Sequence, residues 1–131
     1  MSNTTTTTRP AVQLLAVDEL AERVKAQLPK WTLEGGALCR VVRTAGWKGT
    51  LMVVNTIGHL AEAAWHHPDL AVSYNRVRIA LSTHEAAGIT ARDLALAEKI
   101  EQVLMWQPGA EPDAVLEGTP DEPRHAYILY E

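Results

Sequence analysis

The sequence predicts an α+β fold in the order α-β-β-α-β-β-α, a four-stranded antiparallel sheet with three helices packed on one face. Three observations support this prediction. Three segments repeat apolar residues at helical spacing. Two pairs of short strand-like segments lie between them. A tight turn joins the two strands of each pair, which makes them antiparallel neighbours.

The first helix is predicted over residues 17–28 from an apolar stripe that consists of Leu20, Val24 and Leu28. Pro29 ends it, because proline cannot continue a helix. Two short strands follow, one at Leu33 and one over residues 38–42, around a Gly-Gly turn.

The second helix is predicted over residues 51–65, with a stripe of Leu51, Val54, Ile57, Ala61 and Trp65. Pro68 ends it, because the residue before a proline is disfavoured in the helical region. Strands over residues 70–74 and 77–81 follow, and Asn75 lies at the turn between them.

The third helix is predicted to begin after Thr90 and to run to Trp106. Thr90 is a favourable N-cap, and Asp93 three residues later completes a capping-box-like pair. The apolar stripe of this helix consists of Leu94, Ala97, Ile100 and Leu104.

Composition divides the chain into three parts. Residues 1–12 are polar and of low complexity, so we expect a disordered N-terminal segment. Residues 13–106 form the folded domain. Residues 107–131 are a proline-rich C-terminal extension, and the final HAYILYE has the composition of a strand that can pair with a sheet edge.

The totals exclude several classes of function. The formal net charge of −4 argues against a general nucleic-acid surface. The single cysteine, Cys39, forms no internal disulfide and no zinc-finger spacing, which suits a reducing compartment. We find no signal pattern and no apolar run approaching the roughly 20 residues of a membrane span. We therefore expect a cytoplasmic protein, with association with a microcompartment left open.

The stretch EAAWHHPDL, residues 62–70, places two histidines at the end of the second helix. Glu62 and His66 are four residues apart, so on a helix they share a face, where the carboxylate can fix the imidazole tautomer. His67 leaves the helix and points elsewhere, and His84 ends the last predicted strand. Three imidazoles around one cleft would suit general acid–base catalysis near neutral pH.

Each of these features also has a simpler interpretation. The Glu62/His66 pair could be a solvated surface contact. Asp93 by its spacing alone is more typical of a helix cap than of a catalytic group. His59, Glu62 and His66 resemble a metal-binding face, but without a second ligand helix we predict no metal. The residues alone thus indicate a candidate acid–base site and no particular substrate.

One ordered set of residues resembles a known family. The set consists of Glu62-x-x-x-His66-His67-Pro68, Tyr74-Asn75, Leu81-Ser82-Thr83-His84, Gly88 and Asp93. It is similar to the signature of the pterin-4a-carbinolamine dehydratases, with a weaker extension to a Trp-x-x-Glu segment at Trp31. That family shares the α-β-β-α-β-β-α layout predicted above.

The resemblance implies dehydration of 4a-hydroxytetrahydropterin to quinonoid dihydropterin, with the pterin as substrate and no metal or organic cofactor. By position, His66 and His84 would be the acid–base pair, and His67 would orient the substrate. Substrate-binding or orienting roles would fall to Glu62, Thr83, Asp93 and Trp31.

The resemblance also implies a homodimer or homotetramer. A second function is open, because dehydratase-like proteins also occur beside α-carboxysome genes, where they resemble assembly factors for RuBisCO. The C-terminal extension fits such a branch, whereas the retained histidines fit an enzyme. A histidine site covered by Trp65 or by the extension would favour RuBisCO assembly. An open cleft with all three histidines facing one space would favour catalysis.

Overall fold

The computed structural model describes residues 12–131, and it confirms the predicted α+β class. The domain consists of α1 (Val17–Gln27), β1 (Thr32–Glu34), β2 (Ala37–Arg43), α2 (Trp47–Ala64), β3 (Asp69–Ser73), β4 (Arg76–Leu81) and α3 (Ala91–Leu104). Short 3-10 helices follow β4 and α3, namely η1 (His84–Ala86), η2 (Pro108–Ala110) and η3 (Pro123–His125). Disorder was predicted for residues 1–12, and residues 1–11 of that segment lie outside the described residues.

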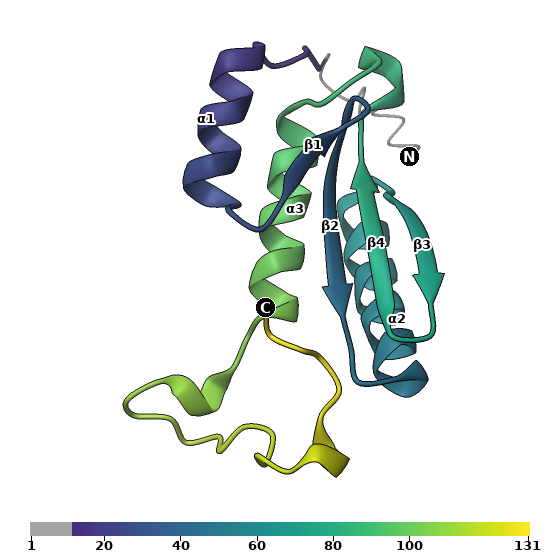
Figure 1. Ribbon diagram of the computed structural model, residues 1–131. Helices are drawn as coiled ribbons and strands as arrows, with labels where there is room; N and C mark the ends of the chain where they lie inside the picture. The colour runs from purple at the N-terminus through teal and green to yellow at the C-terminus, as the bar shows by residue number, and fades with distance from the viewer. Residues whose placement is uncertain (1–11) are drawn as a thin grey trace, which may run out of the picture.

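The four strands form one antiparallel sheet in the order β1-β2-β4-β3 (Figure 1). The two hairpins therefore meet along their inner strands, where Leu38 of β2 pairs with Leu81 of β4 and Val42 pairs with Val77. Alternation along these strands sends the fully buried residues to one face of the sheet. That face carries the helices.

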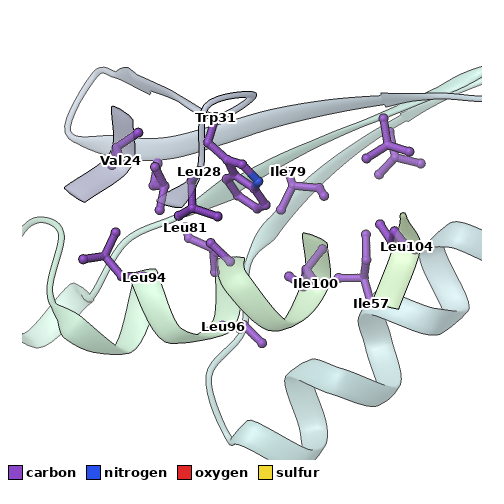
Figure 2. Close-up of a cluster of buried hydrophobic side chains, with 14 of the residues drawn as sticks. Val24, Leu28, Trp31, Ile57, Ile79, Leu81, Leu94, Leu96, Ile100 and Leu104 are labelled. Atoms are coloured by element: carbon purple, nitrogen blue, oxygen red, sulfur yellow. The ribbon is translucent and has the colours of Figure 1, made fainter. Parts of the chain in front are cut away.

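The core lies between this face and the three helices (Figure 2). Each helix contributes an apolar stripe to it, made of Leu20, Val24 and Leu28 near α1, Val53, Ile57 and Ala61 in α2, and Leu94, Ala97, Ile100 and Leu104 in α3. Burial at about 25 cal/mol per Å² of apolar surface is what holds the helices on the sheet. The stripes predicted for the first and third helices are thus confirmed.

The second helix differs from its prediction. It begins at Trp47, four residues before the predicted start, and its buried residues are Gly49, Thr50, Val53, Ile57 and Ala61. Leu51 and Trp65, both predicted to lie in the inward stripe, are 41% and 64% exposed. Ile57 and Ala61 of the predicted stripe are confirmed, whereas its two end residues lie outside the buried face.

Trp31 lies in the core rather than beside the histidines. Its side chain is 3% exposed and lies among the buried apolar side chains (Figure 2). Its indole N–H donates to Glu101 Oε1 at 2.8 Å. Glu101 is eight residues beyond Asp93 in α3, a separation of about 12 Å along the helix axis. The predicted contribution of Trp31 to substrate orientation therefore has no support in its position.

Residues 107–131, all within the described part of the chain, contain no strand, so the predicted C-terminal strand is corrected. The segment runs from the C-terminal end of α3 back to the end of β2 (Figure 1). One isolated bridge joins Ile128 to Thr44, and Leu129 N donates to Arg43 O at 2.9 Å. Ile128 is buried in the core, so the segment is packed onto the domain at this point.

None of the helices in residues 12–131 combines the length and the apolar composition that crossing a membrane requires.

Candidate active site

The two adjacent histidines follow a left-handed residue at the end of α2. The helix ends at Ala64, and Trp65 adopts φ 52° and ψ 47°. The next backbone N–H, that of His66, donates to Ala61 O at 3.1 Å, which closes the helix end. Because the chain changes direction at Trp65, His66 and His67 leave the helix on different sides.

His66 turns toward α3. Its Nε2 lies 2.6 Å from Asp93 Oδ1, and its side chain is nearly buried while Asp93 is fully buried. The predicted Glu62/His66 pair is therefore wrong. The left-handed turn at Trp65 takes His66 off the helical face that it would have shared with Glu62.

Glu62 contacts His67 instead. His67 Nε2 lies 2.5 Å from Glu62 Oε2, and both side chains are at least half exposed. The ring of Trp65 packs edge-on against the His67 ring at a centroid distance of 5.0 Å. An exposed pair of this kind contributes about 0–1 kcal/mol, so Glu62 orients His67 rather than stabilising the fold.

Asp93 combines two roles that the sequence left as alternatives. It is the third residue of α3 and completes a capping box with Thr90, whose backbone N–H donates to Asp93 Oδ2 at 2.8 Å. Oδ2 also accepts from Thr83 Oγ1 at 2.7 Å. The same carboxylate therefore caps the helix through one oxygen and holds His66 through the other.

His84 is the exposed residue that follows Thr83. It begins η1 rather than ending a strand, because β4 stops at Leu81. The loop closes where Thr83 N donates to Gly88 O at 2.7 Å. Through its bond with Thr83, Asp93 ties the segment of His66 and His67 to the segment of His84.

A hollow of about 460 Å³ opens beside His66 between α2 and α3. It is lined by Leu60, Ala63, Ala64, His66, Arg92, Ala95, Leu96 and Lys99. His67 and His84 do not line it. A single cleft shared by all three histidines therefore stays a prediction.

The hydroxyl of Thr90 is the site feature that sequence reasoning missed. Its capping role was visible from spacing, but Thr90 Oγ1 also lies 2.7 Å from Thr83 Oγ1, and both side chains are fully buried. This contact joins α3 to the loop after β4, so no local pattern reveals it.

Among residues 12–131, no group of three His, Cys, Asp or Glu side chains is arranged to hold a metal ion.

Residues 13–103 match the family described as Pterin 4 alpha carbinolamine dehydratase. The chain belongs to this family. The matched residues include every histidine segment described above, and the C-terminal extension lies outside the match.

Similar proteins carry the family name provisionally. A relative from Chloroflexus aurantiacus, named as a pterin-4-alpha-carbinolamine dehydratase, is 44% identical over 90 residues, which cover 69% of this chain and 96% of the relative. A relative of the same name from Aquifex aeolicus is 48% identical over 88 residues, which cover 63% of this chain and 87% of the relative.

The fold also matches a solved member of the family. The crystal structure of a transcriptional coactivator/pterin dehydratase from Brucella melitensis superposes with a TM-score of 0.63 at 26% sequence identity. The superposition covers 68% of this chain and 96% of that chain.

Proposed function

We propose that this protein dehydrates 4a-hydroxytetrahydropterin to quinonoid dihydropterin by histidine acid–base catalysis. The observation that carries the proposal is the buried His66–Asp93 pair, which the chain connects through Thr83 to His84. Membership of the dehydratase family supplies the substrate class.

The reaction needs two proton transfers. The bond between carbon 4a and the hydroxyl oxygen breaks, and a protonated imidazole donates a proton so that water leaves rather than hydroxide. A neutral imidazole takes the proton from the ring nitrogen, and that electron pair forms the new double bond. His66 and His84 are the proposed pair, since an imidazole near neutral pH is available in both forms.

The remaining residues hold the reacting groups. Asp93 fixes the ring of His66 from its buried side, and Glu62 fixes His67, which we propose orients the pterin. Positioning of this kind lowers the barrier by restricting reactants to productive geometry.

Two observations favour catalysis over the alternative of RuBisCO assembly. The C-terminal extension leaves α3 at the end opposite to Thr90 and Asp93, so it does not cover His66 (Figure 1). Trp65 is 64% exposed, and its ring packs against the ring of His67.

The test is the dehydration rate of the purified protein and of His66→Ala and His84→Ala. Loss of a general acid or base costs about 10²–10⁴-fold in rate, so each variant should lose at least about 100-fold in kcat while circular dichroism stays unchanged. His59→Ala is the matched control, because His59 is an exposed histidine in α2, the helix that precedes His66. A wild-type protein that does not accelerate the spontaneous reaction would refute the proposal.

The role in RuBisCO assembly stays a second prediction, supported by the extension outside the family match. That segment frames its own hollow of about 560 Å³, whose lining includes Trp106, Tyr127 and Tyr130. Co-expression with RuBisCO subunits and chaperonin should then raise the yield of assembled enzyme, and removal of residues 107–131 should abolish the gain. An unchanged yield with the full chain counts against this role.

A further inference from the structure

The hydrogen bonds at Asp93 continue beyond the helix cap. Oδ2 accepts from Thr83 Oγ1 at 2.7 Å and from Thr90 N at 2.8 Å, and Thr90 Oγ1 lies farther away at 3.4 Å. The two threonine hydroxyls lie 2.7 Å apart. All three residues are fully buried, so each hydroxyl depends on its protein partners.

Counting hydrogens gives this network a direction. Asp93 as a carboxylate can only accept, so the one hydroxyl hydrogen of Thr83 goes to Oδ2. The hydroxyl hydrogen of Thr90 then goes to Thr83 Oγ1 at 2.7 Å, which is much nearer than Asp93 Oδ2 at 3.4 Å. The oxygen of Thr90 accepts from Arg92 N at 3.3 Å. The result is an ordered chain from Arg92 N–H through Thr90 and Thr83 to Asp93.

The chain determines which oxygen is left for His66. Since Oδ2 already accepts from Thr83 and from the Thr90 backbone, Oδ1 is the oxygen that faces His66 Nε2, at 2.6 Å. An acceptor at that position requires a hydrogen on Nε2. His66 then exchanges protons with a substrate through Nδ1.

We propose that Thr90 and Thr83 are positioning residues that hold the Asp93 carboxylate with Oδ1 toward His66, so that the ring stays in its Nε2–H form and Nδ1 is the reacting nitrogen. For activity this proposal rests on the dehydratase function proposed above, whereas the state of the His66 ring can be measured without it.

The contact between the two threonines goes beyond what helix capping requires. A capping box needs only the Thr90 side chain as acceptor and the Asp93 side chain as acceptor for Thr90 N. The donated bond from Thr90 to Thr83 instead crosses from α3 to the loop that carries His84. Cooperative polarisation along such a buried chain strengthens each bond in it.

Two substitutions separate positioning from capping. Thr83→Val removes one hydroxyl at nearly constant volume and leaves the N-cap intact. Thr90→Val breaks the chain and also removes the cap, whereas Thr90→Ser keeps both and is the matched control. Should Thr90→Val fail to fold, Thr83→Val still tests the proposal.

The first measurement is the nitrogen-15 spectrum of the imidazoles at alkaline pH, assigned with His66→Ala. The wild type and Thr90→Ser should show His66 in the Nε2–H form, and Thr83→Val should show a mixture with the Nδ1–H form. An unchanged His66 signal in Thr83→Val would overturn the proposal.

The second measurement is steady-state dehydration. Bonds to charged groups are the stronger class, so Thr83→Val should lose roughly tenfold in kcat with little change in KM, and Thr90→Ser should lose less than about twofold. An equal loss in both variants overturns the positioning role. A shifted His66 signal in a protein with no dehydratase activity supports the positioning and refutes only the proposed function.

Discussion

Glu101→Ala should destabilise the domain by breaking the ion pair that Glu101 forms with the buried Arg40. Glu101 accepts from Arg40 Nε at 3.0 Å, from Arg40 Nη2 at 3.2 Å and from the Trp31 indole at 2.8 Å. Arg40 is only 7% exposed, on the helix-covered face of the sheet. The substitution therefore leaves a buried guanidinium without its counter-charge.

The size of this destabilisation follows from the hydrogen bonds that Glu101→Ala removes and from those that Arg40 keeps. Removing one partner of a buried ion pair costs about 3–5 kcal/mol. Arg40 keeps two acceptors, Val41 O at 3.0 Å and Glu131 O at 2.9 Å, which places the cost near the lower end. The Trp31 indole loses its acceptor, at about 1 kcal/mol. We expect a loss of about 3–4 kcal/mol in the free energy of unfolding.

Urea denaturation followed by tryptophan fluorescence measures this loss. Glu98→Ala is the matched control, because Glu98 lies in the same helix and is no part of the Arg40 cluster, and its effect should stay within about 0.5 kcal/mol. A loss below about 1 kcal/mol for Glu101→Ala would show that Arg40 is stabilised by solvent and by carbonyls alone.

The same pair predicts the response to acid. Burial by itself raises the pKa of Glu101, but the hydrogen bonds from Arg40 and Trp31, with the charges of Arg40 and Lys30, outweigh it and hold the pKa below its ordinary 4.5. Because the unfolded chain then binds this proton more readily, the contribution is complete above pH 4.5 and is lost as pH falls through the folded-state pKa. Stability of Glu101→Gln should therefore fall less steeply than that of the wild type below pH 4.5, and parallel curves would contradict the assignment.

Two further predictions concern the C-terminal segment. In Gly49→Ala the new methyl would lie 2.8 Å from Tyr127 O, so the C-terminal segment must shift. We expect this shift to cost about 1–3 kcal/mol of stability and to speed proteolysis after Trp106. The control Gly58→Ala meets no atom within 4 Å and should stabilise α2 by about 0.5–1 kcal/mol. Equal stability changes in the two variants would contradict the packing. Burial, with the neighbouring Tyr127 hydroxyl, raises the pKa of Tyr130 to about 12, so absorbance titration should find one tyrosine ionising late, and Tyr127→Phe should lower that pKa. The stability of the fold should fall above pH 10, because there Tyr130 ionises only in the unfolded chain. A Tyr130 that titrates near 10 in the folded protein would contradict this prediction.

The fold was predictable where one local signal determines one element. In α3 the N-cap at Thr90 and the stripe from Leu94 to Leu104 agree, and both are confirmed. In α2 the apolar residues extend beyond the buried stripe, since Leu51 and Met52 are exposed, so the spacing of apolar residues alone did not select the buried face. Contacts distant in sequence do so, among them Tyr127 O against Gly49, and these leave no trace in the spacing of the helix itself.

Sequence reasoning named several residues that lie together around Asp93, but it did not predict how they pair. His66, Asp93 and Thr83 come together as a connected set, whereas the expected partner of His66 was Glu62. Spacing assumes that the helical geometry continues to His66, and the left-handed Trp65 breaks that assumption. Few non-glycine residues adopt this conformation, so sequence reasoning gives it little weight.

At Trp65 the residue that would be best for stability differs from the residue that the proposed activity needs. A left-handed residue other than glycine costs roughly 1–2 kcal/mol, so a screen for heat-resistant variants should recover glycine or asparagine at position 65. Either replacement removes the ring that packs against His67. Heat resistance gained at this position should then come with a loss of the proposed dehydratase turnover, so a thermostabilised variant of this protein should keep Trp65.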